Sequence, residues 1–343
     1  MTIRRLPAEW EAQSGIMLTW PHDRTDWQPI LPEVEPVFAE IAFHASRREK
    51  VLIVARDADL KQHINKLLSK TGANAGNIRF ALADSDDSWA RDHGPITLEE
   101  NQQPLLLDFQ FNAWGGKYGY HHDNLITSHM AQQSCFKCPT QQVAFVLEGG
   151  SIESDGAGTL LTTNCLLTGT RNPGFSKPQI EQFLQATLGI QLFHWLQHGE
   201  LAGDDTDAHI DTLARFVSPT QIVYVKCDDP KDEHFTSLQH MENDLAALRD
   251  RNNQPYMLTP LPLPDAVFNH DGQRLPATYA NFLIINGAVL LPIYGQDKDQ
   301  DAIAILQKCF PSREIIAINC LSLVKQSGSL HCLTMQFPEG VLT

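Results

Sequence analysis

Turn residues that recur between pairs of β-rich runs constrain the fold of this chain more than any other feature. Five segments read as β-hairpins, each with two runs of apolar and β-branched residues around a polar or glycine-containing turn. The strongest signal is Asn286-Gly287, because both residue types accept the positive φ angles of a type I′ turn. The five hairpins are predicted to turn near Gln102, Gly156, Pro219, Gly287 and Ser327.

Helical patterns alternate with these hairpins. Residues 178–188 follow Ser176, which is suited to cap a helix, carry a proline in the first turn and stop at Gly189. The other predicted helices span residues 36–50, 60–68, 238–249 and 301–310. Repeated hairpin-plus-helix units can close about an axis, so we expect one propeller-like α/β domain over residues 1–343, with a generic α+β domain as the alternative.

Composition and charge narrow the range of partners. The 343 residues carry a formal net charge of −15, which argues against nucleic acid, because phosphate binding needs clustered Lys and Arg. No apolar run reaches the length of a membrane span, and no signal-peptide-like segment follows the N-terminal arginines. We therefore expect a cytoplasmic protein with no nucleic-acid and no membrane partner. The seven cysteines do not resemble a disulfide framework, and Cys135 and Cys138 are interpreted as ordinary thiols.

Four polar clusters beside the hairpins contain residue types suited to covalent and acid–base catalysis. They span residues 88–95, 148–151, 204–211 and 331–332. Glu148 ends the apolar run AFVLE, where a buried carboxylate needs a partner, and two glycines after it allow close approach of a ligand. Hydrogen bonds from neighbouring amides are the structural alternative for Glu148.

The positions of His209 and His331 within their segments suggest which of the two histidines acts on Cys332. In a strand, side chains alternate between faces, so His209 and Asp211 would share a face whereas His331 and Cys332 would not. His209, from a distant segment, is therefore the better candidate base for Cys332, because such pairs are assembled in space.

The acidic run at residues 204–211 has a second interpretation as a metal site. Three aspartates, His209 and Asp211 offer ligands for Mg²⁺, Mn²⁺ or Zn²⁺, and residues 121–123 (His-His-Asp) could complete them. The run lacks the spacing and the glycine of a calcium loop. A metal-dependent hydrolase is therefore an alternative that the residues alone leave open.

Taken together, the four clusters have a recognisable order. They read Trp89-x-Arg91-Asp92-x-Gly94-Pro95, Glu148-Gly-Gly-Ser151, Asp204-Asp205-Thr206-Asp207-x-His209-Ile210-Asp211 and His331-Cys332-Leu333-Thr334-x-Gln336. This combination resembles the agmatine deiminase and bacterial peptidyl-arginine deiminase family, over nearly the whole chain. The resemblance implies a five-bladed α/β propeller (pentein) with the active site on its axis, and neither metal nor cofactor. By position it implies Cys332 as nucleophile, His209 as general acid/base, and three substrate carboxylates, which are Asp92, Glu148 and Asp211.

The chemistry of a guanidino substrate fits these residue types. A guanidinium is cationic and its resonance makes the central carbon a poor electrophile, so carboxylates must hold it before a thiolate attacks. The same carboxylates should raise the pKa of Cys332 until a cation binds. The resemblance implies deimination of a guanidino compound, but the motifs do not separate agmatine, arginine and peptidyl-arginine. The lack of a signal-peptide-like segment favours an intracellular metabolite and so agmatine, with arginine or peptidyl-arginine as alternatives and a non-catalytic guanidine-binding protein as a more distant one.

The partner we expect is thus a small cationic guanidino compound, and a homo-oligomer is compatible with the sequence. Agmatine carries an amine in place of the α-carboxylate and ammonium of arginine, so the far end of its pocket should be acidic or aromatic. Six residues are candidates for contacts with the substrate: Trp89, Asp204, Asp205, Trp114, Trp20 and Glu9.

Overall fold

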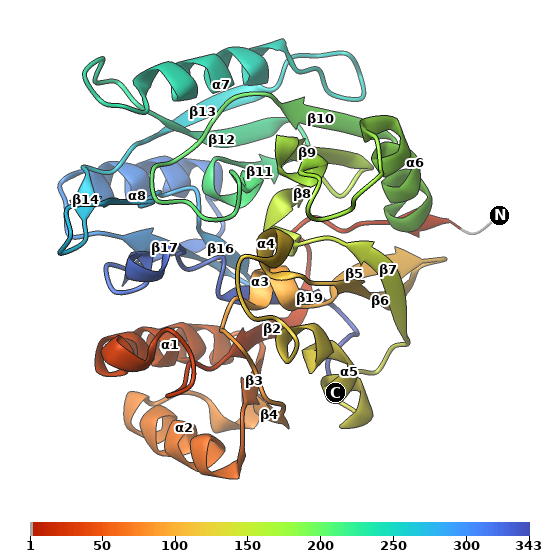
Figure 1. Cartoon of the computed structure of the whole chain (residues 1–343), viewed down its shortest axis with the longest axis vertical. Helices are drawn as coiled ribbons and strands as arrows, with labels where there is room; N and C mark the ends of the chain where they lie inside the picture. The colour runs from red at the N-terminus through yellow and green to blue at the C-terminus, as the bar shows by residue number, and fades with distance from the viewer. Residues whose placement is uncertain (1–2) are drawn as a thin grey trace.

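A computed structural model describes residues 3–343 as an α/β protein with five sheets of three or four strands. Each of these sheets contains an antiparallel pair of strands followed by a parallel strand. The long helices lie toward the outside of the molecule, whereas the short helices α3 (Ala90–His93) and α4 (Ala113–Gly116) lie near its middle (Figure 1). No helix within residues 3–343 is long and apolar enough to cross a membrane.

Four sheets are built on hairpins that the sequence predicts. The turns at Asn101-Gln102 and Asn286-Gly287 join their strands directly. Both residues of the first turn have positive φ, whereas in the second only Gly287 does, so the hairpin is present but its predicted type I′ turn is wrong. In each sheet a helix-containing connection leads to the third, parallel strand, as βαβ units require. The first of these sheets contains β5 (Ile96–Glu100), β6 (Gln103–Gln110) and β7 (Thr140–Val146), with β1 (Arg4–Arg5) beside β5. The second contains β8 (Ile152–Ser154), β9 (Thr159–Thr163) and β10 (Leu192–Leu196), and the third contains β11 (Ala214–Ser218), β12 (Gln221–Lys226) and β13 (Met257–Pro262). The fourth contains β16 (Leu283–Ile285), β17 (Ala288–Ile293) and β18 (Glu314–Asn319).

The fifth predicted hairpin is wrong. Its first run overlaps only the end of β18, at Ile318 and Asn319, and its second run overlaps the start of β19 (Thr334–Pro338), which belongs to a different sheet. Strand β19 instead pairs antiparallel with β2 (Gln13–Thr19) from the other end of the chain, and β3 (Lys50–Ala55) and β4 (Ile78–Leu82) extend that sheet in parallel. The predicted turn near Ser327 is part of a long loop, because β18 already pairs with β17.

The five predicted helices are present, with shifted ends. The capping signal at Ser176 is confirmed, since its side chain and that of Gln179 form a capping box, and Gly189 ends the helix with φ 78°. These helices are α1 (Leu31–Ser46), α2 (Ala58–Thr71), α6 (Lys177–Leu188), α7 (Phe235–Ala247) and α8 (Lys298–Cys309). The remaining elements are α5 (Ile126–Gln132) and the small hairpin of β14 (Val267–Phe268) and β15 (Arg274–Leu275).

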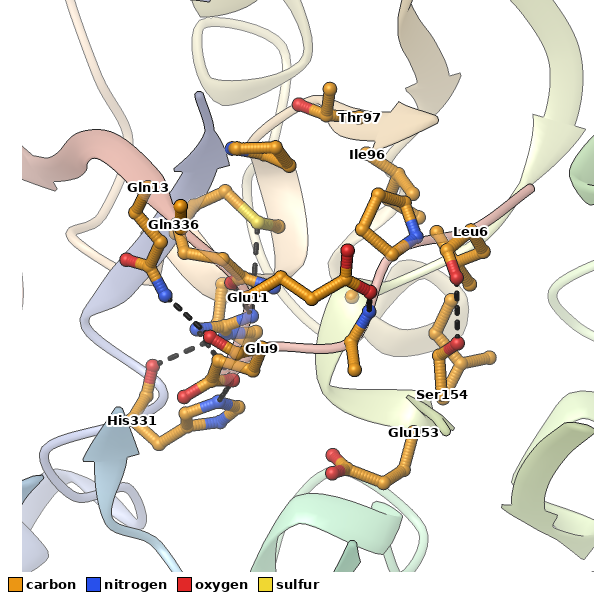
Figure 2. A pocket seen from close by; sticks show the side chains of 18 residues that line it. Leu6, Glu9, Glu11, Gln13, Ile96, Thr97, Glu153, Ser154, His331 and Gln336 are labelled. Carbon is orange, nitrogen blue, oxygen red and sulfur yellow. Dashed lines mark hydrogen bonds and ion pairs between the residues drawn. The ribbon is translucent and has the colours of Figure 1, made fainter. Parts of the chain in front are cut away.

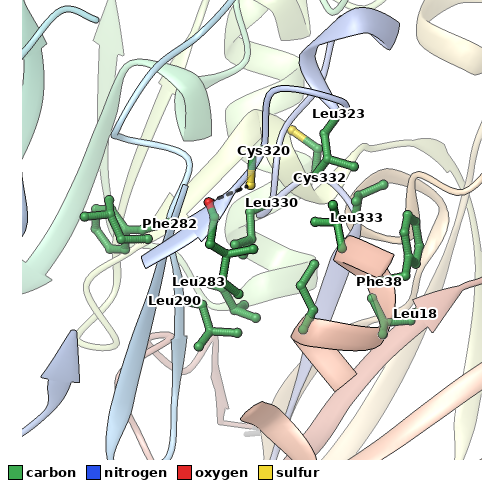
Figure 3. Packing of buried hydrophobic residues seen from close by; sticks show 14 of the residues in the cluster. Leu18, Phe38, Phe282, Leu283, Leu290, Cys320, Leu323, Leu330, Cys332 and Leu333 are labelled. Atoms are coloured by element: carbon green, nitrogen blue, oxygen red, sulfur yellow. Dashed lines mark hydrogen bonds between the residues drawn. The ribbon is translucent and has the colours of Figure 1, made fainter. Parts of the chain in front are cut away.

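The largest hydrophobic cluster reaches from α1 to the segment that carries the last cysteine. Cys332 lies in this cluster with Leu330 and Leu333, and Figure 3 shows it beside Leu323 and Cys320. Apolar packing thus fixes the backbone on both sides of Cys332. Within residues 3–343 all seven cysteines carry free thiols.

Candidate active site

A cavity of about 610 Å³ opens between the loops that carry three of the four polar clusters. Its lining is acidic and aromatic, and among the described residues no Lys, Arg or His contributes to it. Cys332 and Asp92 belong to its wall, together with residues from the segments around 26, 87, 114, 205 and 326. The full lining is Asp26, Asp87, Trp89, Asp92, Trp114, Tyr118, Asp204, Asp205, Thr206, Thr212, Gln326, Ser327, Gly328 and Cys332. Such a cavity favours a small cation.

Cys332 lies in the turn that leads into β19 and is 6% exposed. Its Sγ is 3.3 Å from Asn281 Nδ2 and 3.7 Å from Asp211 Oδ2. Burial, followed by the negative charges of Asp211 and Asp92, raises the pKa of the Cys332 thiol well above its ordinary value. This is the direction that the sequence predicts for a thiol among carboxylates.

His209 immediately precedes a turn of 3-10 helix at Ile210–Thr212, so the predicted strand is wrong at this point. Its Nδ1 lies 3.6 Å from Asp92 Oδ1, and its Nε2 lies 3.9 Å from Glu148 Oε2. Burial alone would lower the pKa of His209, but Asp92 and Glu148 outweigh it and raise the pKa to about 9. The imidazole is therefore protonated at neutral pH, as a general acid must be.

Asp92 approaches this imidazole from another segment, whereas Asp211 lies two residues after His209 in the same turn. Asp92 accepts hydrogen bonds from the backbone N–H of Gly150 and from Trp114 Nε1, both at 2.9 Å. Asp211 Oδ2 accepts from His331 Nδ1 at 2.7 Å, whereas its Oδ1 is buried without a partner within residues 3–343. A buried acceptor of this kind is available to a ligand.

Glu148 is fully buried and does not line the cavity. Both of its oxygens accept from Arg171 Nε at 2.9 Å, and this arginine also reaches Asp207 and the carbonyl of Thr206. Burial opposes ionisation of Glu148, but His209 and Arg171 reverse the effect and lower its pKa. The sequence gives no sign of Arg171, which is an isolated basic residue in a polar loop.

Gly150 makes the convergence of these groups possible. A methyl group built at its Cα would lie 2.7 Å from His209 Nδ1, 2.8 Å from Asp92 Oδ1 and 3.2 Å from Asp211 Oδ2. The three side chains therefore meet over a residue that has none, which explains the second glycine after Glu148.

Comparisons with known proteins identify the family of this chain. A family model described as Porphyromonas-type peptidyl-arginine deiminase matches residues 5–338. The chain belongs to this family. The family resemblance that the four motifs indicate is thereby confirmed.

Several deiminases are similar to this chain over almost its full length. The structure of a Porphyromonas gingivalis protein provisionally named arginine deiminase is 47% identical with a TM-score of 0.93, and the match covers 99% of this chain and 100% of that chain. A C. jejuni agmatine deiminase, a cysteine-to-serine variant with substrate bound, is 35% identical with a TM-score of 0.91, covering 99% of this chain and 97% of that one. The agmatine deiminase of Stutzerimonas stutzeri is 32% identical over 97% of this chain and 95% of its own length. The chain shares the α/β pentein fold of these deiminases.

Two of the six residues expected to contact a deiminase substrate lie elsewhere. Trp20 is 1% exposed, packs on Phe38 and donates from Nε1 to Glu35 at 3.0 Å, so it fills the core. Glu9 lines a second cavity, described below. The other four, Trp89, Trp114, Asp204 and Asp205, line the cavity at Cys332.

The second cavity, of about 660 Å³, lies where the N-terminal segment crosses His331 (Figure 2). Glu9 accepts there from Arg215 Nη2 and lies 2.8 Å from His331 Nε2. His331 and Cys332 thus line different cavities, although neither is in a strand. The N-terminal segment therefore supports the site from behind and does not contact the cavity at Cys332.

The acidic run does not gather as a metal site would. Asp204 accepts from the hydroxyl of Thr206 and the N–H of Ala208, both at 2.7 Å, and so shapes its own turn. Asp207 pairs with Arg171 and Lys117. No group of three His, Cys, Asp or Glu side chains within the described part of the chain is arranged to hold a metal ion.

Proposed function

We propose that this chain is an agmatine deiminase, which converts agmatine and water to N-carbamoylputrescine and ammonia. The observation that carries the proposal is the acidic cavity that ends at Cys332 and has no cationic side chain in its described lining. Agmatine is cationic at both ends, so such a cavity suits its whole length. The names of two relatives, from C. jejuni and Stutzerimonas stutzeri, support the same substrate.

The guanidinium is proposed to lie between Asp92 and the free Oδ1 of Asp211, next to Cys332. Paired carboxylates hold a planar guanidinium in one orientation, and the rings of Trp89 and Trp114 lie in the same wall. The ammonium at the far end would then face Asp204 and Asp205. Lys117, which might have bound a substrate carboxylate, already pairs with Asp205 and Asp207.

The proposed reaction has two covalent steps. The Cys332 thiolate attacks the central carbon, and His209 donates a proton to one nitrogen, so that the C–N bond breaks and ammonia leaves. Water then attacks the resulting thiouronium, and His209 accepts one proton from that water. The hydroxyl of the tetrahedral adduct loses its proton to solvent as the C–S bond breaks, which releases the urea product and the Cys332 thiolate. Each proton that His209 gives in the first step is recovered in the second.

Glu148 has a different role in this proposal from the other carboxylates. Like Asp211 it does not line the cavity, but both of its oxygens accept from Arg171, whereas Asp211 Oδ1 has no partner within residues 3–343. We therefore propose that Glu148 keeps His209 protonated and oriented, rather than contacting the guanidinium.

We further propose that the five sheets are the blades of one propeller-like domain spanning residues 1–343. The repeated unit of an antiparallel pair and a parallel strand supports this arrangement. The site residues come from the connections between sheets, where the inner ends of such blades would meet.

A substrate panel tests the function. Ammonia release should be at least about 10²-fold faster in kcat/KM with agmatine than with arginine or arginyl peptides, because an arginine carboxylate would enter an acidic cavity without a partner. A preference for arginine or peptides would instead favour the activities named for the family and for the Porphyromonas gingivalis relative. Chelators should leave the rate unchanged; a loss that added metal restores would favour a metal hydrolase.

Gly150→Ala tests the convergence of the site residues. The added methyl group must displace His209 or Asp92, and shifts of this size reduce rates strongly, so we expect kcat/KM for agmatine to fall on the order of 10²-fold. Gly169→Ala is the matched control, because nothing lies within 4 Å of that position. Equal activity of both variants would contradict the proposed geometry.

A further inference from the structure

The turn that precedes His209 has an unfavourable backbone conformation. Asp207 and Ala208 have φ angles of 65° and 67°, in the left-handed region that residues with a Cβ rarely adopt. Such conformations persist only where the surrounding structure holds them. Because His209 follows directly, the groups that hold this turn also determine where its imidazole lies.

Hydrogen bonds from two threonines hold part of the turn. Thr163 Oγ1 donates to the carbonyl of Ala208 at 2.7 Å, and Thr206 Oγ1 accepts from the backbone N–H of His209 at 3.1 Å. Neither bond reaches the carbonyl of Thr206 or the carboxylate of Asp207, which are the polar groups on the N-terminal side of the turn. A buried partner from another segment contacts both of these groups.

Arg171 is that partner. Its Nη2 donates to the carbonyl of Thr206 at 2.8 Å, and its Nη1 donates to Asp207 Oδ2 at 2.7 Å. On its other side, Nε donates to both oxygens of Glu148 at 2.9 Å, and Glu148 Oε2 lies 3.9 Å from His209 Nε2. One guanidinium, on a fully buried side chain, therefore joins the turn before His209 to the carboxylate beside its ring.

The contacts of Arg171 require the shape of a guanidinium. Its three nitrogens reach acceptors on three segments, around Glu148, Thr168 and Thr206. A guanidinium carries its N–H groups in a rigid planar fork, whereas the ammonium of lysine carries all its hydrogens on one nitrogen. A lysine could thus supply the charge at this position but not all of the contacts.

We propose that Arg171 is a positioning residue that holds the strained turn before His209 and thereby fixes this histidine beside Glu148. Arg171 does not line the cavity at Cys332, so it acts through His209 and not on the substrate. The effect of this role on turnover rests on the deiminase function proposed above. Because the carboxylates proposed to hold the guanidinium are other groups, loss of Arg171 should lower kcat with little change in KM.

Arg171→Met tests this role in turnover. With the substrate that the panel identifies, kcat should fall on the order of 10²-fold while KM changes less than about threefold, because a misplaced acid–base group slows the chemistry. Arg171→Lys keeps the charge but should stay at least about tenfold below the wild type in kcat. Arg4→Met is the matched control, because Arg4 also joins a carboxylate, that of Glu100, to a backbone carbonyl, that of Thr187. Its kcat should equal that of the wild type.

Hydrogen exchange provides a test that needs no substrate. The backbone N–H groups of Ala208 and His209 are hydrogen-bonded to side chains of the acidic run, so they should exchange slowly in the wild type. In Arg171→Met, exchange in a peptide covering residues 204–209 should be at least about tenfold faster, as read by mass spectrometry. Exchange in α6 (Lys177–Leu188) should not change, which separates a loosened turn from global unfolding.

Ala208→Gly relates the loss of turnover to the strained turn. Glycine adopts a positive φ readily, so this change should raise kcat at least about threefold in the Arg171→Met background and have a smaller effect in the wild type. If Arg171→Met does not fold, Asp207→Ala removes one acceptor of Arg171 instead. It should lower kcat and speed exchange at residues 204–209, each by at least about threefold.

Unchanged exchange at residues 204–209 in a folded variant would overturn the proposal, and so would equal effects of Ala208→Gly in both backgrounds. Failure of both Arg171→Met and Asp207→Ala to fold would also overturn it, since Arg171 would then belong to the scaffold. Because exchange requires no substrate, a loosened turn would support the role of Arg171 even if the substrate panel excluded agmatine.

Discussion

Cys332→Ala should lose essentially all ammonia release from agmatine, a reduction of at least about 10⁴-fold, while the protein still binds agmatine. The reason is that the substitution removes the only group proposed to bond covalently to carbon, whereas Asp92 and Asp211 remain to hold the cation. Binding is measured by calorimetry on the inactive variant, and turnover by ammonia release.

The control is Cys135→Ala, another buried thiol that lies in a different hydrophobic cluster from Cys332. It should retain wild-type turnover. Full activity in Cys332→Ala would end the covalent mechanism. Loss of both binding and thermal stability would mean that the thiol serves the core, in which Leu330 and Leu333 flank it.

Asp92→Asn should damage binding and rate together. It removes a charge from the guanidinium site, and it also removes a carboxylate that raises the pKa of His209. We expect kcat/KM for agmatine to fall on the order of 10³-fold. The loss of activity at high pH should begin at lower pH than in the wild type, because a less stabilised imidazolium gives up its proton sooner.

Asp108→Asn serves as the control for removing a buried carboxylate as such. Asp108 lies in β6, its contact is the hydroxyl of Ser128, and burial raises its pKa to about 6. Its substitution should leave kcat/KM unchanged. An Asp92→Asn variant with normal affinity for agmatine would contradict the placement of the guanidinium beside Asp92.

Patterns of neighbouring residues predict the turns and helix ends, because these depend on residues that are close in the sequence. The Asn286-Gly287 turn and the capping box at Ser176 each depend on residues a few positions apart, and both are found where expected. The pairing of β19 with β2 joins residues more than three hundred positions apart, and no local pattern reports it. The apolar runs on either side of the glycine-containing loop near Ser327 therefore predict a hairpin that does not form.

The same distinction applies to the site. Asp92, Glu148, His209, Asp211 and Cys332 stand in distinctive motifs, whereas Asn281 and Arg171 are single polar residues that gain their positions from loops. Glu9 and Trp20 were candidates on residue type alone. No local pattern indicates whether such a side chain faces the cavity at Cys332, the second cavity or the hydrophobic core.

The pairing of β19 with β2 has a consequence for how the enzyme comes into being during translation. The strand that follows the nucleophile leaves the ribosome more than three hundred residues after its partner. Until then β2 keeps an open antiparallel edge, which is a site for wrong pairing between nascent chains. A chain stopped shortly before residue 332 would therefore be both inert and prone to aggregate, so that the edge of β2 is covered only when the nucleophile is also present.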